Sequence, residues 1–305
     1  MHDPVLVEEI CNWISPHPQG VYVDCTLGLG GTTRRILERA GHSAVVICMD
    51  RDCEALALSK NSLTYYEDSI FFYHGNFSHL ERFIGDSGYH EQEVDGIVFD
   101  LGVSSWQLDQ AERGFSFRQD GPLDMRMDKT QRLTAEDLVN EIPERDLADL
   151  IFQFGEERFS RRIARGVVRA RDLHPIKTTH ALVKVIEESV PGSYRRGRLH
   201  PATRTFQALR IAVNQELDIL EEALRSAVRF LKVGGRLCVL SFHSLEDRIV
   251  KHTFRAMAGK EHGMISILTK KPLLPGEEEV RRNPRARSAK LRVAERLENL
   301  KGAMP

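Results

Sequence analysis

A glycine-rich segment near the start of the chain has the composition of a ligand-binding turn. It reads DCTLGLGGT over residues 24–32 and follows a short apolar run, 21–25, that predicts a buried strand. Glycine allows positive φ and close approach of the backbone to a ligand, and the helix predicted at 32–40 offers free N–H groups at its start. Such turns also serve plain chain reversal. If this one binds a ligand, its contacts are Gly28, Gly30, Gly31 and Thr32.

The spacing of the glycines argues against a dinucleotide. A GxGxxG fingerprint would place its third glycine where this chain has Thr33, so a pyrophosphate site is disfavoured. Asp50 ends the second predicted strand, 44–49, where a carboxylate can accept both hydroxyls of a ribose. An aspartate there can also cap the next helix. Together with the glycine turn, Asp50 favours a nucleoside ligand.

Two more candidates follow the next two predicted strands. Phe77 comes after the strand 70–73, where its ring could flank an adenine or belong to the core. Asp100 ends the strand 96–99. Because the carboxyl ends of parallel strands meet at one edge of a sheet, we expect these residues to share a crevice with the glycine turn and Asp50.

The predicted elements give an α/β sheet that is interrupted by helices. The strands above alternate with helices at 32–40 and 54–63, which is typical of a parallel, doubly wound sheet. A fifth strand is expected at 235–242, and two further strands at 265–269 and 290–294. Between the fourth and fifth strands the pattern predicts helices at 134–140, 144–154, 159–171, 179–189 and 207–231. We therefore expect an α/β domain formed by residues 1–110 and 211–305, with a helical insertion at 111–210.

The charge distribution indicates a polyanionic partner. The formal net charge is −1, which does not indicate a generally basic nucleic-acid binder. Residues 158–171 nevertheless carry six arginines and residues 194–210 carry five, with no acid in either stretch, and residues 281–292 are similar. Any one stretch could be a solvated helix face, but three together favour contacts with phosphates. The stretches 158–171 and 194–210 are the expected surface for such a partner.

Several other classes of protein are disfavoured because the sequence lacks their characteristic motifs. Its five cysteines form no CxxC pair and its twelve histidines have no metal-ligand spacing, so neither a disulfide framework nor a metal site is expected. No apolar run approaches the roughly 18 residues of a membrane span. The first residues lack the pattern of a secretory signal. We expect a cytoplasmic protein that does not bind membranes.

Long stretches of the chain resemble the bacterial 16S rRNA cytosine-N4 methyltransferase family, the MraW type. The resemblance runs in order through nearly the whole sequence and is most specific at GPLDMRMD and SFHSLEDRIVK, residues 121–128 and 241–251. It implies a class I (Rossmann-like) methyltransferase sheet that is mostly parallel, has a C-terminal antiparallel hairpin and is interrupted by a helical insertion. It also implies methyl transfer from S-adenosylmethionine to the exocyclic amine of a cytidine in the decoding region of 16S rRNA, within the small ribosomal subunit.

The resemblance also implies roles for individual residues. The cofactor contacts of the family fall on Gly30, Gly31, Thr32, Asp50, Phe77, Asp100 and Gln107. The family usually has histidine where this chain has Thr32, which puts the contribution of an imidazole there in doubt. The catalytic candidates are Asp100, as an acceptor for the amine hydrogens, and His243, which follows the fifth strand and could instead be structural. Asp124 and Arg126 could reach the target base or only hold their own loop.

Other functions fit part of the pattern. A nicotinamide-dependent dehydrogenase would share the strand order and Asp50, but Thr33 and the lack of an identifiable hydride-transfer acid disfavour it. A non-catalytic RNA-binding factor would leave the nucleoside pocket unused. A methyltransferase of proteins or small molecules would leave the arginine-rich stretches unexplained.

Overall fold

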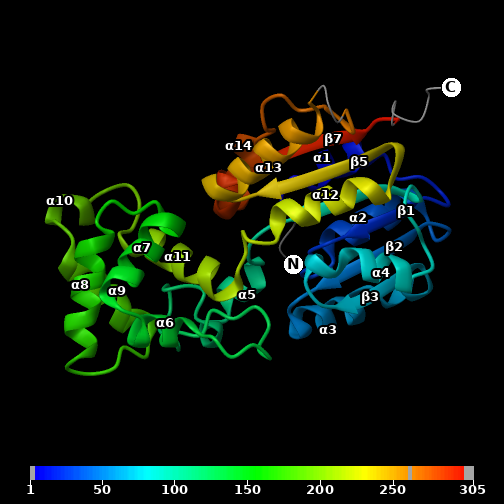
Figure 1. Cartoon of the computed structure of the whole chain (residues 1–305). Coiled ribbons are helices and arrows are strands. Elements are labelled where there is room, and N and C mark those ends of the chain that lie inside the picture. The colour runs from blue at the N-terminus through cyan, green and yellow to red at the C-terminus, as the bar shows by residue number, and fades with distance from the viewer. Residues whose placement is uncertain (1–3, 260–262, 299–305) are drawn as a thin grey trace. The chain divides into compact units, whose positions relative to one another are not determined.

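The computed structural model describes residues 4–259 and 263–298, which form two compact units (Figure 1). The α/β unit comprises the described residues up to Gly102 and from Leu217 onward. The helical unit is Val103–Glu216. It is slightly longer at both ends than the insertion expected at 111–210. No helix in the described part of the chain combines the length and apolar composition needed to cross a membrane.

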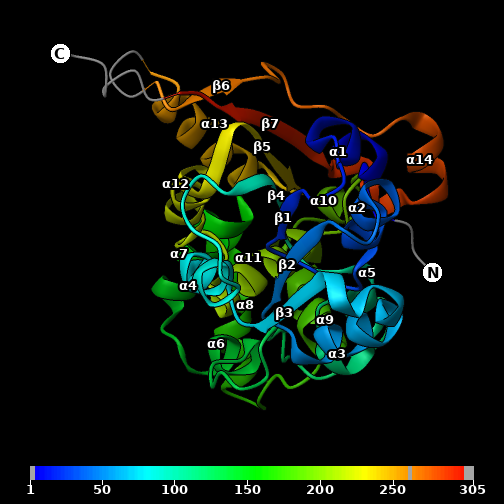
Figure 2. The same ribbon diagram turned by 90° about the vertical axis from the view of Figure 1, so that its right-hand side faces the viewer.

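The α/β unit is built on a seven-stranded sheet with the order β3-β2-β1-β4-β5-β7-β6, which Figure 2 shows from one edge to the other. Strands β1 to β5 are parallel, β7 pairs with β5 in the antiparallel direction, and β6 pairs with β7 in the same way. The expected mostly parallel methyltransferase sheet with an antiparallel C-terminal hairpin is thereby confirmed. The strands are β1 Val21–Asp24, β2 Val45–Asp50, β3 Ile70–His74, β4 Val94–Asp100, β5 Leu231–Ser241, β6 Ile265–Ile267 and β7 Lys290–Arg296.

Helices cover both faces of this sheet, because alternate strand residues point to opposite sides. In β1, Val21 and Val23 pack into one core with helices α4, α12 and α13, whereas Tyr22 packs into another with α1, α2 and α3. The helices of this unit are α1 Val7–Ile14, α2 Gly31–Ala40, α3 Cys53–Ser62, α4 Leu80–Asp86, α12 Leu220–Phe230, α13 Ser244–Met257 and α14 Glu277–Arg282, with 3-10 helices η1 Thr64–Ser69, η2 Phe77–His79 and η4 Pro284–Ser288.

The helical unit has a hydrophobic core of its own. Its centre is formed by fully buried aliphatic side chains such as Ile151, Ile163, Leu182 and Leu209, each from a different helix. Amphipathic helices gain most of their stability from packing of this kind. The elements are α5 Ser105–Asp109, η3 Ala111–Arg113, α6 Ala135–Glu141, α7 Glu144–Gly155, α8 Ser160–Arg171, α9 Thr179–Ser189, α10 Gly192–Arg195 and α11 Ala202–Asn214.

The expected long helix 207–231 is wrong. The structure divides this segment into α11, which ends at Asn214, and α12, which begins at Leu220. Gln215 takes the left-handed conformation (φ 49°) that ends α11. The Asn214 amide holds this end by accepting from the Met127 N–H (2.8 Å) and donating to the Met125 carbonyl (2.7 Å). The helix therefore stops where a buried side chain ties it to a distant loop.

Arg113 fixes the same loop from inside the core of the helical unit. Its side chain is 1% exposed and donates to the carbonyls of Arg126 and Met127, both at 3.0 Å. We expect Arg113→Met to lower the free energy of unfolding of this unit by about 1–3 kcal/mol, because buried carbonyls lose their donor. Urea denaturation measures this. The exposed Arg118→Met is the matched control, expected to change stability by less than about 0.5 kcal/mol. Equal losses in both variants would contradict the account.

Candidate active site

The glycine turn after β1 has the geometry that its sequence predicts. Gly28 and Gly30 have φ of +53° and +77°, and the Gly30 N–H closes the turn on the Leu27 carbonyl at 2.8 Å. A Cβ on Gly30 would lie 2.7 Å from the Leu63 side chain, and one on Gly31 would lie 2.8 Å from Pro4. The turn thus needs glycine for its φ angle and for its packing. The N–H groups of the first turn of α2 have no partner within the helix and are available to a ligand.

Replacement of Gly30 by alanine tests both requirements. We expect Gly30→Ala to lower the free energy of unfolding by more than the roughly 1–2 kcal/mol that positive φ alone costs. Gly88→Ala is the control, because Gly88 has a similar φ of +85° and a Cβ added there would meet nothing within 4 Å. Thermal denaturation of both variants measures the difference. A loss in Gly30→Ala no larger than in Gly88→Ala would mean that Leu63 imposes no constraint.

Asp50 binds the glycine turn from the end of β2. Its Oδ2 accepts from the Gly28 N–H (2.7 Å) and its Oδ1 from the Asp52 N–H (2.8 Å). Asp50 is not the cap of the next helix, because Asp52 caps α3 by accepting from the N–H groups of Glu54 and Ala55. Each carboxylate oxygen can accept a further hydrogen bond. Asp50 is therefore placed to accept from two neighbouring hydroxyls of a ligand.

Asp24 is a buried carboxylate that sequence reasoning did not single out. It ends β1, is 1% exposed, and accepts from the Thr33 hydroxyl (2.7 Å) and the Thr26 N–H (3.2 Å). The Thr26 hydroxyl in turn accepts from the Asp100 N–H at 2.6 Å. These bonds connect β1, α2 and β4 just below the turn. An acid at the end of an apolar strand, directly before the glycines, was the available signal.

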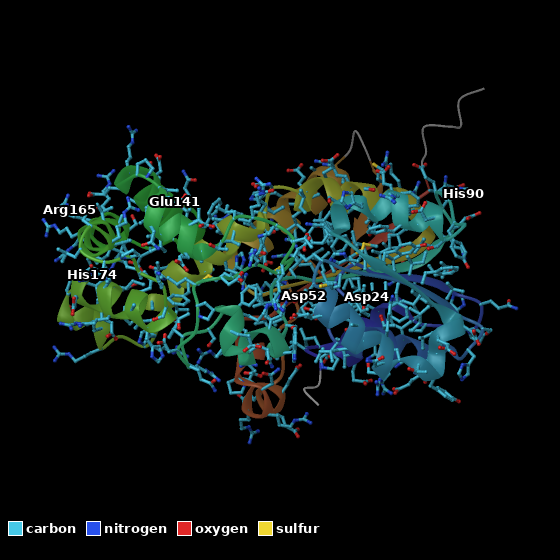
Figure 3. All side chains as sticks on the ribbon, turned by 90° about the horizontal axis from the view of Figure 1, so that it is seen from below. Asp24, Asp52, His90, Glu141, Arg165 and His174 are labelled. Atoms are coloured by element: carbon cyan, nitrogen blue, oxygen red, sulfur yellow. The ribbon has the colours of Figure 1, made fainter. Side chains whose placement is uncertain are left out.

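Four carboxyl groups make this edge of the sheet electrostatically negative. Burial, together with the charges of Asp24 and Glu246, raises the pKa of Asp100 to about 8. Burial raises the pKa of Asp50 to about 6, although the N–H groups of Asp52 and Gly28 act against it. Burial also raises the pKa of Asp24, which Figure 3 labels near Asp52 in the α/β unit. A cation bound here would favour the ionised carboxylates.

Phe77 has features of both roles proposed for it, a ring that flanks an adenine and a member of the hydrophobic core. The ring is partly buried against the core and meets Phe99 edge-on, with centroids 5.4 Å apart. Phe77 follows Gly75, whose N–H donates to the Asp50 carbonyl at 2.8 Å, so the segment is tied to the end of β2. Phe77 is therefore only partly buried, and it follows a segment that is anchored at the end of the strand that carries Asp50.

His243 has the contacts of a helix cap. Its Nδ1 accepts from the Glu246 N–H (3.4 Å), while Glu246 Oε2 accepts from the His243 N–H (3.3 Å), which completes a capping box at the start of α13. The Nε2 lies 3.1 Å from Glu246 Oε1. The structure therefore favours the structural interpretation of His243. It also reveals Glu246, 2% exposed, as a buried acid that sequence reasoning missed.

The remaining candidates belong to the helical unit. Gln107 is buried and completes the capping box of α5, where its Oε1 accepts from the Ser104 N–H at 2.9 Å. Arg126 donates twice to Asp124, at 2.7 and 2.8 Å, so these two residues hold their own loop. At the carboxyl-terminal edge of the adjacent parallel strands β1 to β4 the structure places Gly28, Gly30, Gly31, Thr32, Asp50, Phe77 and Asp100. Thr32 is buried.

The arginine-rich stretches contain arginines of two kinds. Arg171 donates to the carbonyls of Val139 and Ile142, both at 2.8 Å, and so holds α6 and α8 together. Arg292 pairs with Asp247 at 2.7 Å. Other members have exposed side chains, namely Arg158, Arg161, Arg162, Arg165 and Arg169 in the first stretch and Arg195, Arg196 and Arg198 in the second. Figure 3 shows Arg165 on the outside of the helical unit. Only the exposed members are available to a partner.

Comparison with known proteins places these features in a family. Residues 1–297 match the family described as the MraW methylase family. A ribosomal RNA small subunit methyltransferase H of Halothermothrix orenii is 48% identical over an alignment of 311 positions that covers 98% of this chain and 99% of that protein. The protein of the same name from a Cyanothece strain is 50% identical and covers 99% of this chain and 97% of its own.

Among solved structures, an rRNA methylase from Streptococcus thermophilus has a TM-score of 0.46. It is 11% identical, and the alignment covers 98% of this chain and 99% of that one. This similarity is too low to indicate a shared function. The family match and the identity to the two relatives carry the assignment.

Proposed function

The chain belongs to the MraW methylase family, and from this premise we propose that it transfers a methyl group to the N4 amine of a cytidine in 16S rRNA. The observation that carries the proposal is the match over residues 1–297, joined to relatives about half identical whose names specify small-subunit ribosomal RNA. The family also excludes the nicotinamide-dependent alternative. S-adenosylmethionine is the cofactor, as in the methylase family.

The edge of the sheet suits this cofactor. When bound, S-adenosylmethionine supplies an electrophilic methyl group on a positively charged sulfur. We propose that Asp50 accepts from the ribose hydroxyls, that Phe77 flanks the adenine, and that Gly28, Gly30, Gly31 and Thr32 contact the cofactor with Gln107 as a further ligand. Burial raises the pKa of Asp100 and of Asp50, so ionising either carboxyl group is unfavourable in the free protein. A sulfonium group bound nearby would stabilise the ionised forms.

The protein must compensate for a weak nucleophile. The lone pair of the cytidine N4 is delocalised into the ring, so orientation of the amine is the main requirement. We propose that Asp100, ionised beside the bound cation, accepts a hydrogen bond from this amine and then its proton. His243 acts as a positioning residue, because its ring holds Glu246 and the start of α13.

Cofactor affinity should depend on pH. In the free protein Asp100 stays protonated below its pKa of about 8, whereas a bound cation favours the ionised form. Binding below that pH therefore releases a proton, and the affinity for S-adenosylmethionine should rise between about pH 6 and 8, by at most tenfold per unit, and then level off. Calorimetric titration measures this. S-adenosylhomocysteine, which lacks the sulfonium charge, is the control and should show a weaker dependence. Equal slopes for both ligands would contradict the assignment.

We propose that the rRNA is held by the helical unit. Its exposed arginines in 158–171 and 194–210 can contact phosphates, which would set position and salt dependence without selecting the base. The target cytidine would have to be single-stranded or extruded from its stack to reach a pocket. A cytoplasmic location, where ribosomal subunits are found, is part of the same proposal.

Nucleoside analysis in cells tests the proposal. A strain without this gene should lack N4-methylated cytidine at one position of its 16S rRNA. The wild-type gene should restore the modification, and the Asp50→Ala variant should not. Full N4 methylation in the strain without the gene would refute the proposed substrate, and loss of a different methylated nucleoside would replace it.

A further inference from the structure

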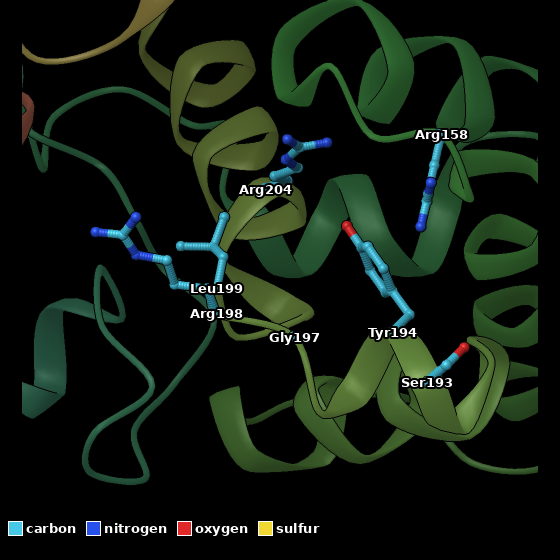
Figure 4. Close-up of a pocket in the computed structure, with 7 residues that line it drawn as sticks. All are labelled: Arg158, Ser193, Tyr194, Gly197, Arg198, Leu199 and Arg204. Carbon is cyan, nitrogen blue, oxygen red and sulfur yellow. The ribbon is translucent and has the colours of Figure 1, made fainter.

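The helical unit contains a cavity that the proposed reaction does not use. Its volume is about 370 Å³, and its walls are formed by Arg158, Ser193, Tyr194, Gly197, Arg198, Leu199 and Arg204 (Figure 4). All seven residues belong to the helical unit, and none is a candidate for cofactor binding or proton transfer. They come from both arginine-rich stretches, since Arg158 begins the first and the others belong to or adjoin the second. The fold thus brings two separate basic segments to one site.

The aromatic wall of this cavity is rigidly held. The Tyr194 hydroxyl donates to Glu157 Oε2 at 2.5 Å, and Glu157 is completely buried and also accepts from the Phe159 N–H at 2.8 Å. Burial and the Glu157 carboxylate raise the pKa of Tyr194 to about 12, so the hydroxyl stays a neutral donor. Phe159 packs edge-on against the Tyr194 ring with centroids 4.9 Å apart. The ring is therefore ordered before any ligand arrives.

The three arginine side chains that line the cavity differ in their contacts with its walls. The Arg158 guanidinium lies over the Phe159 and Tyr194 rings, 4.8 and 5.2 Å from their centroids, and Figure 4 shows it beside Tyr194. Arg204 is anchored by a bond from Nη1 to the Glu156 carbonyl at 2.9 Å. The Arg198 side chain is exposed, and in the same view it points away from Tyr194. The three guanidinium groups outnumber the single buried carboxylate of Glu157, so the cavity favours an anion.

We propose that this cavity is a second RNA-binding site, which holds one nucleotide of a single-stranded segment of the substrate away from the methylated base. The inference rests on the proposed function. The phosphate of the held nucleotide is contacted by Arg158 and the next phosphate along the strand by Arg198, which points away from Tyr194, since a guanidinium can bind a phosphate through two parallel hydrogen bonds. The base or ribose packs against Tyr194 and Leu199, which is 46% exposed. Aromatic rings flanked by cations are the usual means of holding single-stranded nucleic acid without reading its sequence.

Binding of a short RNA to the full-length protein tests this site. The probe is fluorescein-labelled oligouridylate of about 12 nucleotides, within the range that single-strand sites cover, followed by fluorescence anisotropy at several KCl concentrations. We expect Arg198→Gln and Arg158→Gln each to raise Kd about five- to tenfold and to reduce the slope of log Kd against log salt by about one. Arg145→Gln is the matched control: the same change at an exposed arginine of the helical unit, outside the cavity and outside both arginine-rich stretches, should alter Kd less than about twofold.

Variants of Tyr194 separate stacking from charge. Tyr194→Leu should raise Kd with the salt slope unchanged, and Tyr194→Phe should retain binding because the ring remains. The inference is overturned if the wild type does not bind the probe, or if Arg198→Gln behaves like Arg145→Gln.

Methyl transfer to small ribosomal subunits, measured in parallel, separates this inference from the proposed function. If the protein is active in methyl transfer but Arg198→Gln does not change the Kd for the probe, only the proposed nucleotide site in the cavity is refuted. If the protein is inactive but Arg198→Gln still weakens probe binding, only the proposed reaction is refuted.

Discussion

Asp50→Ala should raise the Kd for S-adenosylmethionine at least about 100-fold. Two charge-assisted hydrogen bonds to the ribose would be lost, each worth about 1.5–3 kcal/mol, and 1.4 kcal/mol corresponds to a tenfold change in Kd. The carboxylate is already oriented for this role by the N–H groups of Gly28 and Asp52. Isothermal titration calorimetry with purified wild type and variant measures the effect directly.

The control must separate a lost ligand contact from a disturbed turn. Ser59→Ala serves this purpose, because the Ser59 hydroxyl donates to the Gly28 carbonyl at 2.5 Å and so supports the same turn from α3. It should cost about 1 kcal/mol of stability and change Kd by less than about threefold. If Ser59→Ala weakens binding as much as Asp50→Ala, then Asp50 acts through the turn and not on the cofactor.

Asp100→Asn should lower kcat about 100-fold or more, the usual contribution of a positioned proton acceptor. The amide can still accept a hydrogen bond from the cytidine amine, but it cannot take the proton. Single-turnover methylation of small subunits at saturating cofactor measures this without interference from cofactor affinity or product release.

His243→Asn is the matched test of the other catalytic candidate. Asparagine is a favoured N-cap, so it can keep the start of α13 while the imidazole is removed. We expect kcat within about threefold of wild type, since the ring is needed only to hold the cap. A loss as large as that in Asp100→Asn would make the imidazole, and not the carboxylate, the proton acceptor.

The sheet and its glycine turn could be predicted from sequence because local chemistry determines them. The apolar run before Asp24 and the run that ends at Asp50 fit only buried strands. Gly30 has the positive φ and the close neighbour that exclude other residues. The hydrogen bond from Gly28 to Asp50 then follows from parallel strands whose ends meet at one edge. The prediction therefore succeeded where the position of a residue is determined by the strand to which it belongs.

Features that depend on distant contacts could not be predicted. The segment 214–220 has neither glycine nor proline, so the local sequence does not indicate where α11 ends. The end of this helix is fixed by the hydrogen bond from the Asn214 amide to the Met125 carbonyl. Glu246 looks like an ordinary helix-start acid until the fold buries it where it raises the pKa of Asp100. Arg171 and Arg169 are equivalent in sequence, yet only Arg171 reaches two carbonyls of the α6 region. Such distinctions arise only from tertiary packing.

Methyl transfer by the purified protein tests the central claim most directly. Small subunits from cells that lack the gene are incubated with the protein and methyl-labelled S-adenosylmethionine, and the RNA is digested to nucleosides. We predict that the label appears in N4-methylcytidine of 16S rRNA and that it disappears with Asp50→Ala. Label in another nucleoside, or none on subunits or naked rRNA despite measurable cofactor binding, would contradict the proposed reaction.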